Sequence, residues 1–520
     1  MTTQSVRRLA AALTVTGALT VGITAVSTAQ EPQADVVRTD KGPVRGVADG
    51  RSVVFNGIPY AAPPVGAQRF TLPQPAAAWS GVRDGSKKGA VCAQTNTEGT
   101  ALLPGSAEDC LYLNVTTPRK PGKPKPVMVW LHGGGWNNGS GNDYDGTWLS
   151  ETGDVVVVSI NYRLGTLGFL GYPGLKDSGT YGLADQQAAL RWVQRNARAF
   201  GGDPRNVTLL GESAGGLSTC AQLASPGARG LFHKAIIESG ACSMNWPADL
   251  QYPGATVQDW WAPRSELKAT GETVGKQIGC DDLACLRKAD PLQLLTLTRY
   301  FGHGGTGTPL LPVDPRTALK AGIGSRVPVI EGNTRDEQAY FGWLFELDGK
   351  FDEAKYQQYL VKSFGDRAAT VARRYPSSKY DSPMQAWNTV GSDRAWICTA
   401  LTDSKQRAKR APVYTYSFAD RTATPYLDFP PGYRTDAYHS SELPYLFDFG
   451  PLLNPAQQEV SRTMLRYWTN FARTGDPNGP GLPVWKQYGR SGTGQSFQVG
   501  GATSVDLDAL HNCDFWRGLK

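Results

Sequence analysis

Residues 207–216, which read VTLLGESAGG, decide how this chain is interpreted. The four opening residues predict a buried strand, and AGGLSTCAQLA (214–224) predicts a helix that follows at once. Between them, Ser213 is flanked by Gly211 and Gly215 in the pattern G-x-S-x-G. Such a strand–turn–helix exposes a serine hydroxyl and directs a backbone N–H towards an oxyanion. The alternative is an ordinary glycine-rich turn, because a chain with 60 glycines in 520 residues can contain this pattern by chance.

Short apolar and β-branched runs on both sides of this stretch predict further strands. Runs that are apolar on both faces favour the interior of a mostly parallel sheet. A helix is predicted over 184–200, where Leu190, Val193, Ala197 and Phe200 recur at helical spacing with arginines opposite. Strands that alternate with a helix indicate an α/β fold with a central, mostly parallel, twisted sheet flanked by helices. The predicted strands are 126–132, 155–162, 207–210, 234–239, 327–332 and 413–418.

The rest of the chain contains no internal repeat and no clear linker between domains. Loop-like stretches near 300–313, 420–436 and 489–496 predict large loop and helical insertions over one core. A single domain is therefore expected over residues 30–520.

The first 29 residues differ in character from all that follow. Arg7 and Arg8 precede an apolar run over 9–26, and the small residues Ser27 and Ala29 come next. This order is typical of a secretory signal peptide, so a secreted protein cleaved after position 29 is expected. An uncleaved membrane anchor is the alternative, but threonines and glycines interrupt the run and no stop-transfer pattern follows.

Charge and cysteine content narrow the possible partners. The formal net charge is +7 without any basic block, which argues against a nucleic-acid partner. Eight cysteines in an exported chain indicate disulfides. A zinc site is the competing explanation, but CxxC, HExxH and paired histidine spacings are absent from the sequence. Neither a metal nor another cofactor is expected.

A serine nucleophile needs a base that takes its proton, and the chain has five histidines. His439 lies downstream of Ser213 in TDAYHSSELPYLF (435–447), a polar loop from which a base can extend. Position favours His439 without excluding the other four. These are His132 before a glycine run, His233 beside a strand, His303 in a loop and His511 near the C-terminus.

A second glycine-rich segment, LHGGGWNNGSG (131–141), follows a predicted strand. Successive glycines can turn backbone N–H groups towards a negative oxygen without interference from Cβ atoms. Gly134 and Gly135 would join Ala214 in an oxyanion hole, where each donor contributes roughly 3–4 kcal/mol to transition-state stabilisation. A flexible turn is the alternative for three glycines taken alone.

Taken together, these motifs resemble the type-B carboxylesterases, the cholinesterase-like branch of the α/β-hydrolases. The resemblance implies the α/β-hydrolase fold and a triad in which Ser213 is the nucleophile and His439 the base. It extends over most of the chain after the signal segment, through the segments 55–70, 107–115, 127–136, 160–170, 182–193, 200–216 and 437–447.

The resemblance also implies the third member of the triad. The acid of the family falls in GNTRDEQAYF (332–341), which makes Glu337 the acid, with Asp336 and Glu331 as alternatives. A glutamate soon after a predicted strand is well placed to orient a histidine. Gln338 stands where the family usually has glycine, which puts the local backbone in question.

The resemblance orders the cysteines into three bridges. It pairs Cys92 with Cys110, Cys280 with Cys285 and Cys398 with Cys513; the first loop should contribute about 3 kcal/mol by chain entropy. Cys220 and Cys242 remain, either as a fourth bridge or as two buried free thiols. Arg69 with Glu108, and Arg163 with Asp185, resemble structural ion pairs of the family.

The expected reaction is ester hydrolysis through an acyl-enzyme, by a monomer acting on a small-molecule ester. Glu212 is expected either to add negative potential near His439 or to serve as a structural acceptor. Activity should fall as the imidazole takes up a proton below roughly pH 6–7. Trp136 and Trp246 resemble aromatic residues of a substrate pocket, with core packing as the alternative.

The loop between the first two cysteines indicates the class of ester. Its residues 93–109, AQTNTEGTALLPGSAED, are mostly small or polar, unlike the apolar lid of family lipases. It also lacks the tryptophan that cholinesterases use for a quaternary ammonium group. Short-chain alkyl or aryl esters are therefore expected. The alternatives are a lipase-like hydrolase of longer acyl or polyester substrates and a non-catalytic binding domain.

Overall fold

The computed structural model describes residues 35–519 apart from 121, 490 and 491. The predicted signal segment, residues 1–29, lies outside the described residues. A mixed sheet of eleven strands passes through the described part, in the spatial order β20-β19-β18-β17-β12-β11-β9-β10-β8-β4-β3. The strands are β3 (Val47–Asp49), β4 (Ser52–Pro59), β8 (Tyr112–Pro118), β9 (Lys125–Leu131), β10 (Val156–Ile160), β11 (Gly202–Glu212), β12 (Lys234–Glu238), β17 (Val329–Thr334), β18 (Val413–Phe418), β19 (Thr493–Gln498) and β20 (Gly501–Asp506).

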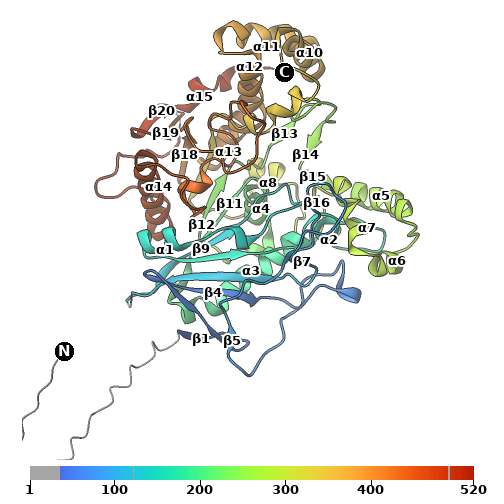
Figure 1. Ribbon diagram of the computed structural model, residues 1–520, viewed down its shortest axis with the longest axis vertical. Coiled ribbons are helices and arrows are strands. Elements are labelled where there is room, and N and C mark those ends of the chain that lie inside the picture. Colours follow the sequence, from blue (N-terminus) through green and yellow to red (C-terminus); the bar gives the residue numbers. More distant parts are fainter. Residues whose placement is uncertain (1–34, 121, 490–491, 520) are drawn as a thin grey trace, which may run out of the picture. The chain divides into compact units, whose positions relative to one another are not determined.

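The sheet is parallel in its middle and antiparallel at both edges; Figure 1 labels its strands β4, β9, β11, β12, β18, β19 and β20. Strands β10, β9, β11, β12, β17, β18 and β19 are parallel to their neighbours within this set. Strand β20 at one edge, and β8, β4 and β3 at the other, run antiparallel to the strands they pair with. The predicted α/β class with a mostly parallel sheet is confirmed.

The middle strands are apolar on both faces because both faces are covered by helices. In β9, Val129 and Leu131 belong to one buried cluster, together with Leu217 of α4 (Ala214–Ala224). Met128 and Trp130, which alternate with these residues along the strand, belong to a second cluster with α1 (Thr147–Gly153) and α14 (Pro455–Thr474). Side chains alternate between the faces of a strand, so a continuous apolar run serves two cores.

The ends of α14 show why this helix begins and ends where it does. Asn454 caps it through a capping box with Gln457, and Pro455 occupies the first turn, where a missing N–H leaves no bond unmade. Gly475 follows the last turn with φ +81°, a conformation that favours glycine.

The predicted helix over 184–200 is observed as α3 (Tyr181–Asn196) followed by one 3₁₀ turn, Ala197–Phe200. The expectation of an insertion loop over 489–496 was wrong from Thr493 onward, where β19 begins. The segment TGQSFQ has no run of β-branched residues, and β19 is held by pairing on both sides, to β18 and β20. Within 300–313, a short strand β16 (Gly304–Thr306) also forms, whereas 420–436 contains neither helix nor strand.

Helical insertions lie between β12 and β18. They include α5 (Arg264–Gly275), α6 (Leu283–Lys288) and α7 (Pro291–Leu295), and further along the chain α10 (Glu353–Phe364), α11 (Ala368–Arg374) and α12 (Pro383–Gly391). Residues Asp35–Lys520 form one unit by their mutual contacts. Across the described ranges, no helix has both the length and the apolar character needed to cross a membrane.

Disulfides join all eight cysteines. The three pairs implied by the resemblance form, and Cys220 on α4 is bonded to Cys242, which lies beyond the end of β12. The alternative of two free thiols is therefore wrong. The ion pairs Arg69–Glu108 and Arg163–Asp185 are also present, at 2.5 and 2.7 Å.

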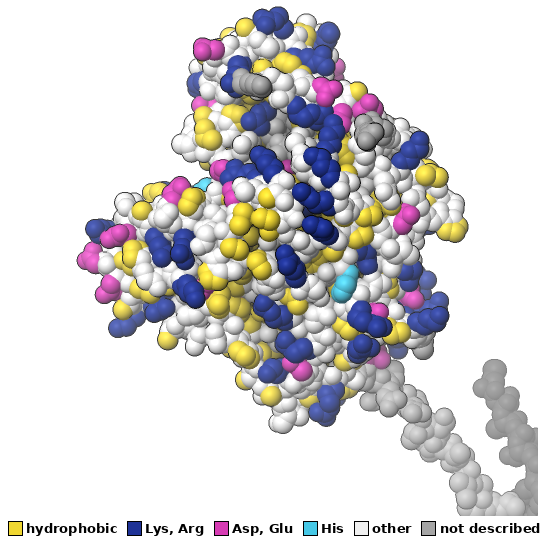
Figure 2. Space-filling model, turned by 180° about the vertical axis from the view of Figure 1, so that it is seen from behind, with side chains coloured by type: hydrophobic (Ala, Val, Ile, Leu, Met, Phe, Trp, Pro, Cys, Tyr) yellow, Lys and Arg dark blue, Asp and Glu magenta, His cyan; other side chains and the backbone are white. Residues whose placement is uncertain are grey.

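Surface charge is distributed and not gathered in one block on the face shown in Figure 2. Lys and Arg side chains lie dispersed over that face, with hydrophobic side chains between them and fewer Asp and Glu. This agrees with the modest formal charge of +7 on 520 residues.

Candidate active site

The order of the strands reverses around β9, and this places two loops side by side. From β9 the chain adds β10 on one side and then returns to add β11 on the other. In parallel sheets, ligands bind outside the carboxyl ends of the strands at such a switch point. Leu131 at the end of β9 is in register with Gly211 of β11, so the glycine run after β9 meets the turn after β11.

The turn after β11 is strained and tightly enclosed. Ser213 has φ +57° and ψ −121°, a rare conformation for a residue with a side chain, and it joins β11 to α4. A Cβ atom at Gly215 would lie 2.0 Å from the Leu131 carbonyl oxygen, and one at Gly211 would lie 2.5 Å from the Gly215 carbonyl. Glycine is thus required at both positions, and the turn holds the serine hydroxyl at the carboxyl end of β11.

Three side chains from separate loops form a continuous hydrogen-bonded chain at the carboxyl ends of the parallel strands. The Ser213 Oγ lies 2.9 Å from His439 Nε2, and His439 Nδ1 lies 2.6 Å from Glu337 Oε2. A carboxylate accepts only, so Nδ1 carries a proton and Nε2 is left to accept from the serine hydroxyl. The arrangement can therefore remove a proton from the hydroxyl of Ser213.

The Glu337 carboxylate is fully buried and is held from several directions. Besides the imidazole, Oε1 accepts from Asn333 Nδ2 at 2.9 Å and from the Thr334 backbone N–H at 3.1 Å. The two alternative acids are engaged elsewhere. Asp336 pairs with Arg421 at 2.6 Å, and Glu331 contacts Arg407 and Ser404.

The glycine run after β9 lies against the serine turn. A Cβ atom at Gly133 would come within 3.0 Å of Ser213 Cβ. Gly134 and Gly135 have φ of +94° and +60°, and among the described residues neither N–H donates to another group. Ala214 is the first residue of α4, where backbone N–H groups have no partner within the helix. The two turns that meet at Ser213 thus contain three backbone N–H groups without a partner in the described part of the chain.

Two further buried glutamates, Glu238 and Glu442, lie close enough to Glu212 to affect its ionisation. The Glu212 Oε1 is 3.1 Å from His439 Nε2, and burial together with the negative charges of Glu442, Glu337 and Glu238 raises the pKa of Glu212 well above its usual range. Burial likewise raises the pKa of Glu442 far above normal and that of Glu238 to about 8. Both groups are fully buried. Both the burial and the neighbouring negative charges disfavour the ionised form of Glu212, and so they oppose the negative potential expected of it near His439.

Sequence reasoning missed Glu238 and Glu442. For Glu238 a signal existed, because it closes the predicted strand 234–239 at the carboxyl edge of the sheet. For Glu442, three residues after His439, the sequence carries no signal, because its burial is set by distant segments.

Replacing Glu238 with glutamine is expected to stabilise the protein more at about pH 8.5 than at about pH 5. An unfolded glutamate loses its proton near pH 4.3, roughly, whereas folded Glu238 retains it to about pH 8. The folded state binds more protons between these values, so wild-type stability falls as the pH rises through this window. Glutamine removes that titration and keeps an oxygen to accept from Trp468 Nε1, which lies 2.7 Å from Glu238 Oε1.

Thermal unfolding at both pH values measures this effect. For a chain of this size, a change of 1 kcal/mol in the free energy of unfolding shifts the melting temperature by roughly 2 °C or less. Glu98→Gln, at an exposed position, is the matched control and should change the melting temperature equally at both pH values. An equal change for Glu238→Gln would contradict the prediction.

Aromatic residues border His439 on one side, and the nearest was not predicted. The Trp396 ring centroid lies 4.5 Å from that of His439, with Tyr340 at 5.7 Å and Phe341 at 6.3 Å. We call Trp396, Tyr340 and Phe341 the aromatic wall. Trp246 lies behind it, 5.0 Å from Trp396. No local pattern in the sequence distinguishes Trp396 from the other 13 tryptophans.

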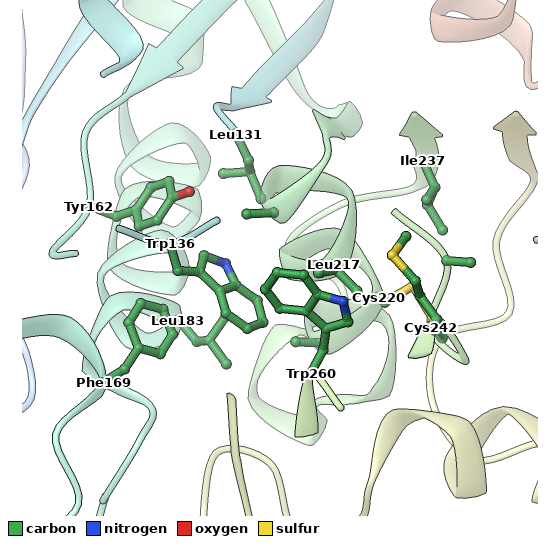
Figure 3. Packing of buried hydrophobic residues seen from close by; sticks show 14 of the residues in the cluster. Leu131, Trp136, Tyr162, Phe169, Leu183, Leu217, Cys220, Ile237, Cys242 and Trp260 are labelled. Carbon is green, nitrogen blue, oxygen red and sulfur yellow. A yellow bond between two sulfur atoms is a disulfide. The ribbon is translucent and has the colours of Figure 1, made fainter. Parts of the chain in front are cut away.

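Trp136 belongs to the core and does not contact His439. Its Nε1 donates to Ser218 Oγ at 2.9 Å, and its ring stacks on Phe169. Figure 3 shows the indole packed between Phe169 and Trp260, near Leu183. The packing alternative therefore describes Trp136, whereas Trp246 supports the aromatic wall from behind.

Possible metal ligands do not converge in the described part of the chain. Residues 35–519, with the gaps stated above, contain no group of three or more His, Cys, Asp or Glu side chains suited to hold a metal ion.

Comparisons with known proteins agree over nearly the whole chain. A family model described as "Carboxylesterase family" matches residues 33–516. The chain is 35% identical over 506 residues to the cocaine esterase of Homo sapiens, covering 89% of this chain and 86% of the relative. It is also 35% identical over 468 residues to the para-nitrobenzyl esterase of Bacillus subtilis (strain 168), covering 85% and 90%.

A solved structure described as a PNB esterase is similar in three dimensions. It superposes with a TM-score of 0.74 at 32% sequence identity, and the match covers 92% of this chain and 99% of the other.

Proposed function

Because this chain belongs to the carboxylesterase family, with the α/β-hydrolase fold, it is a carboxylic ester hydrolase, and we propose that Ser213, His439 and Glu337 are its catalytic triad. The observation that carries the proposal is the unbroken hydrogen-bonded chain from Glu337 Oε2 through both nitrogens of His439 to Ser213 Oγ. It takes a separate base to make a serine hydroxyl nucleophilic, and this chain supplies one.

The proposed reaction proceeds through an acyl-enzyme. His439 Nε2 takes the hydroxyl proton as Ser213 Oγ attacks the ester carbonyl, and the same proton passes to the departing alcohol. Water then attacks the acyl-serine by the same route. Glu337 stays ionised and stabilises the imidazolium, which its three hydrogen bonds support.

The N–H groups of Gly134, Gly135 and Ala214 are proposed to hold the oxyanion of the tetrahedral intermediate. Their support is that two of them lie on a glycine run with positive φ and the third begins α4. Donors that are fixed before the reaction need no reorganisation as charge develops on the oxygen.

Short-chain alkyl or aryl esters are the proposed substrates. The aromatic wall offers flat apolar surface beside His439, which suits aromatic groups. The para-nitrobenzyl esterase of Bacillus subtilis is named for an ester with such a group. The polar loop 93–109 supports soluble esters over lipid aggregates.

Export from the cell is proposed as well, with residues 1–29 as the signal peptide and 30–520 as one catalytic domain. The support is the basic, apolar and small-residue order of the leader, together with four disulfides, which persist in oxidising compartments.

A serine-directed phosphonate tests the proposed nucleophile, and a series of p-nitrophenyl esters with increasing acyl length tests the proposed substrates. One equivalent should attach to the peptide that contains Ser213, as read by mass spectrometry, and turnover of p-nitrophenyl acetate should be lost in proportion. Full turnover after complete labelling, or labelling of another residue, would refute the assignment of Ser213. A rise in kcat/KM towards long acyl chains would favour the lipase-like alternative.

A further inference from the structure

Gln338 follows Glu337 directly and is completely buried. Its backbone has φ −68° and ψ −16°, a helical conformation open to any residue, so the departure from glycine leaves the backbone unstrained.

The Gln338 amide ties the turn that carries Glu337 to a distant loop. Nε2 donates to the backbone oxygens of Leu250 and Gln251, at 2.8 and 3.1 Å. Two carbonyl acceptors fix the orientation of the amide, because only its nitrogen can donate. On the backbone side, the Gln338 N–H donates to Ser392 Oγ at 3.0 Å.

The surrounding structure leaves space for this side chain. A Cβ atom at Gly391, on α12, would lie 2.5 Å from Gln338 Cγ. A side chain at 338 and none at 391 therefore form a complementary pair across this contact.

The loop that Gln338 holds begins at the residue behind the aromatic wall. Leu250 and Gln251 lie between β13 (Asn245–Trp246) and β14 (Gln258–Asp259), which pair with Trp246 opposite Gln258. Trp246 contacts Trp396 at 5.0 Å and Phe341 at 6.3 Å between ring centroids. Both of these rings border His439. The hydrogen bonds of the Gln338 side-chain amide are therefore linked to the reacting imidazole through a continuous series of packed groups.

We propose that Gln338 is a positioning residue that determines specificity: it anchors the loop 247–257 and thereby keeps Trp246 and the aromatic wall closed against long acyl chains. This rests on the proposed esterase function. Side chains held in one arrangement by hydrogen bonds exclude substrates that a mobile wall would admit. Gln338 itself touches neither the serine nor the ester, and its effect passes through the loop.

The experiment compares kcat and KM for p-nitrophenyl acetate and p-nitrophenyl octanoate in four proteins. Gln338→Met keeps the volume and removes both N–H donors. Gln338→Gly removes both volume and donors, and Gln338→Gly combined with Gly391→Ala returns part of the volume without the donors. Each variant is first checked for cooperative thermal unfolding, so that folding and specificity are read separately.

All three variants should raise the octanoate-to-acetate ratio of kcat/KM by about 3- to 10-fold, the size expected when hydrogen bonds of ordinary strength are lost. The rise should come from a lower KM for octanoate, with kcat for acetate within about 3-fold of wild type. A folded Gln338→Met protein with an unchanged ratio would overturn the proposal, as would equal losses on both esters. Unchanged turnover of both esters by Ser213→Ala would instead overturn the proposed catalytic triad on which this inference rests.

Discussion

Replacing Ser213 with alanine is expected to lower kcat/KM for p-nitrophenyl acetate by about 10⁴- to 10⁶-fold, the range seen when a triad nucleophile is removed. The reason is that Oγ forms the bond to the acyl group, and among the described residues His439 Nε2 forms a hydrogen bond with no other hydroxyl. The residual rate should come from the oxyanion donors and substrate binding. Initial rates measure the loss, and the variant preparation must first be shown to contain no wild-type enzyme.

Ser239→Ala is the matched control for this substitution. Ser239 also follows a parallel strand, β12, and also has a positive φ of +50°. It is buried, but its Oγ has no hydrogen-bond partner among the described residues. Its loss should leave kcat/KM within several-fold of wild type. Comparable losses in both variants would mean that the Ser213 effect reflects folding and not chemistry.

Replacing Glu337 with glutamine should lower kcat by about 10³- to 10⁴-fold, as found when the acid of a serine triad becomes an amide. Glutamine is nearly the same size, so the buried cavity stays filled. Its amide group cannot stabilise the imidazolium as an ionised carboxylate does, and an N–H facing Nδ1 would favour the wrong tautomer of His439. Steady-state kinetics and thermal unfolding of the same preparation separate catalysis from stability.

Asp336→Asn is the control for the acid. This neighbouring carboxylate pairs with Arg421 at 2.6 Å and also accepts from the Ala437 backbone N–H at 3.3 Å. Removing its charge should weaken the ion pair and change kcat by less than about 10-fold, as for an interaction that is partly exposed. If Asp336→Asn lost more activity than Glu337→Gln, Asp336 would be the acid and Glu337 a structural residue.

The parts of the fold that could be predicted from the sequence are those that local physics controls. The buried strand before Ser213, the glycines at 211 and 215, and the helix after them are dictated by hydrophobic pattern and by steric limits within a few residues. The same holds for the predicted strands 126–132 and 413–418. These positions matched because neighbouring residues alone nearly determine them.

The parts that could not be predicted depend on contacts between distant segments. Strand β19 has a polar, glycine-containing sequence and forms because β18 and β20 pair with it. Trp396 contacts His439, and Glu442 is buried near Glu212, only after several loops have come together. The bond between Cys220 and Cys242 was left open for the same reason, since spacing does not determine which cysteines approach.

The wide sequence separation of the triad has a consequence for how the molecule comes into existence. Ser213 and His439 are 226 positions apart, and Glu337 and His439 are 102 apart. Contacts of such high separation form late, after the loops between them have closed. A nascent chain that ends before β18 would carry Ser213 and Glu337 but would lack His439 and the strands from β18 to β20. Ester cleavage during refolding should therefore begin only after the segments that carry Ser213, Glu337 and His439 have come together.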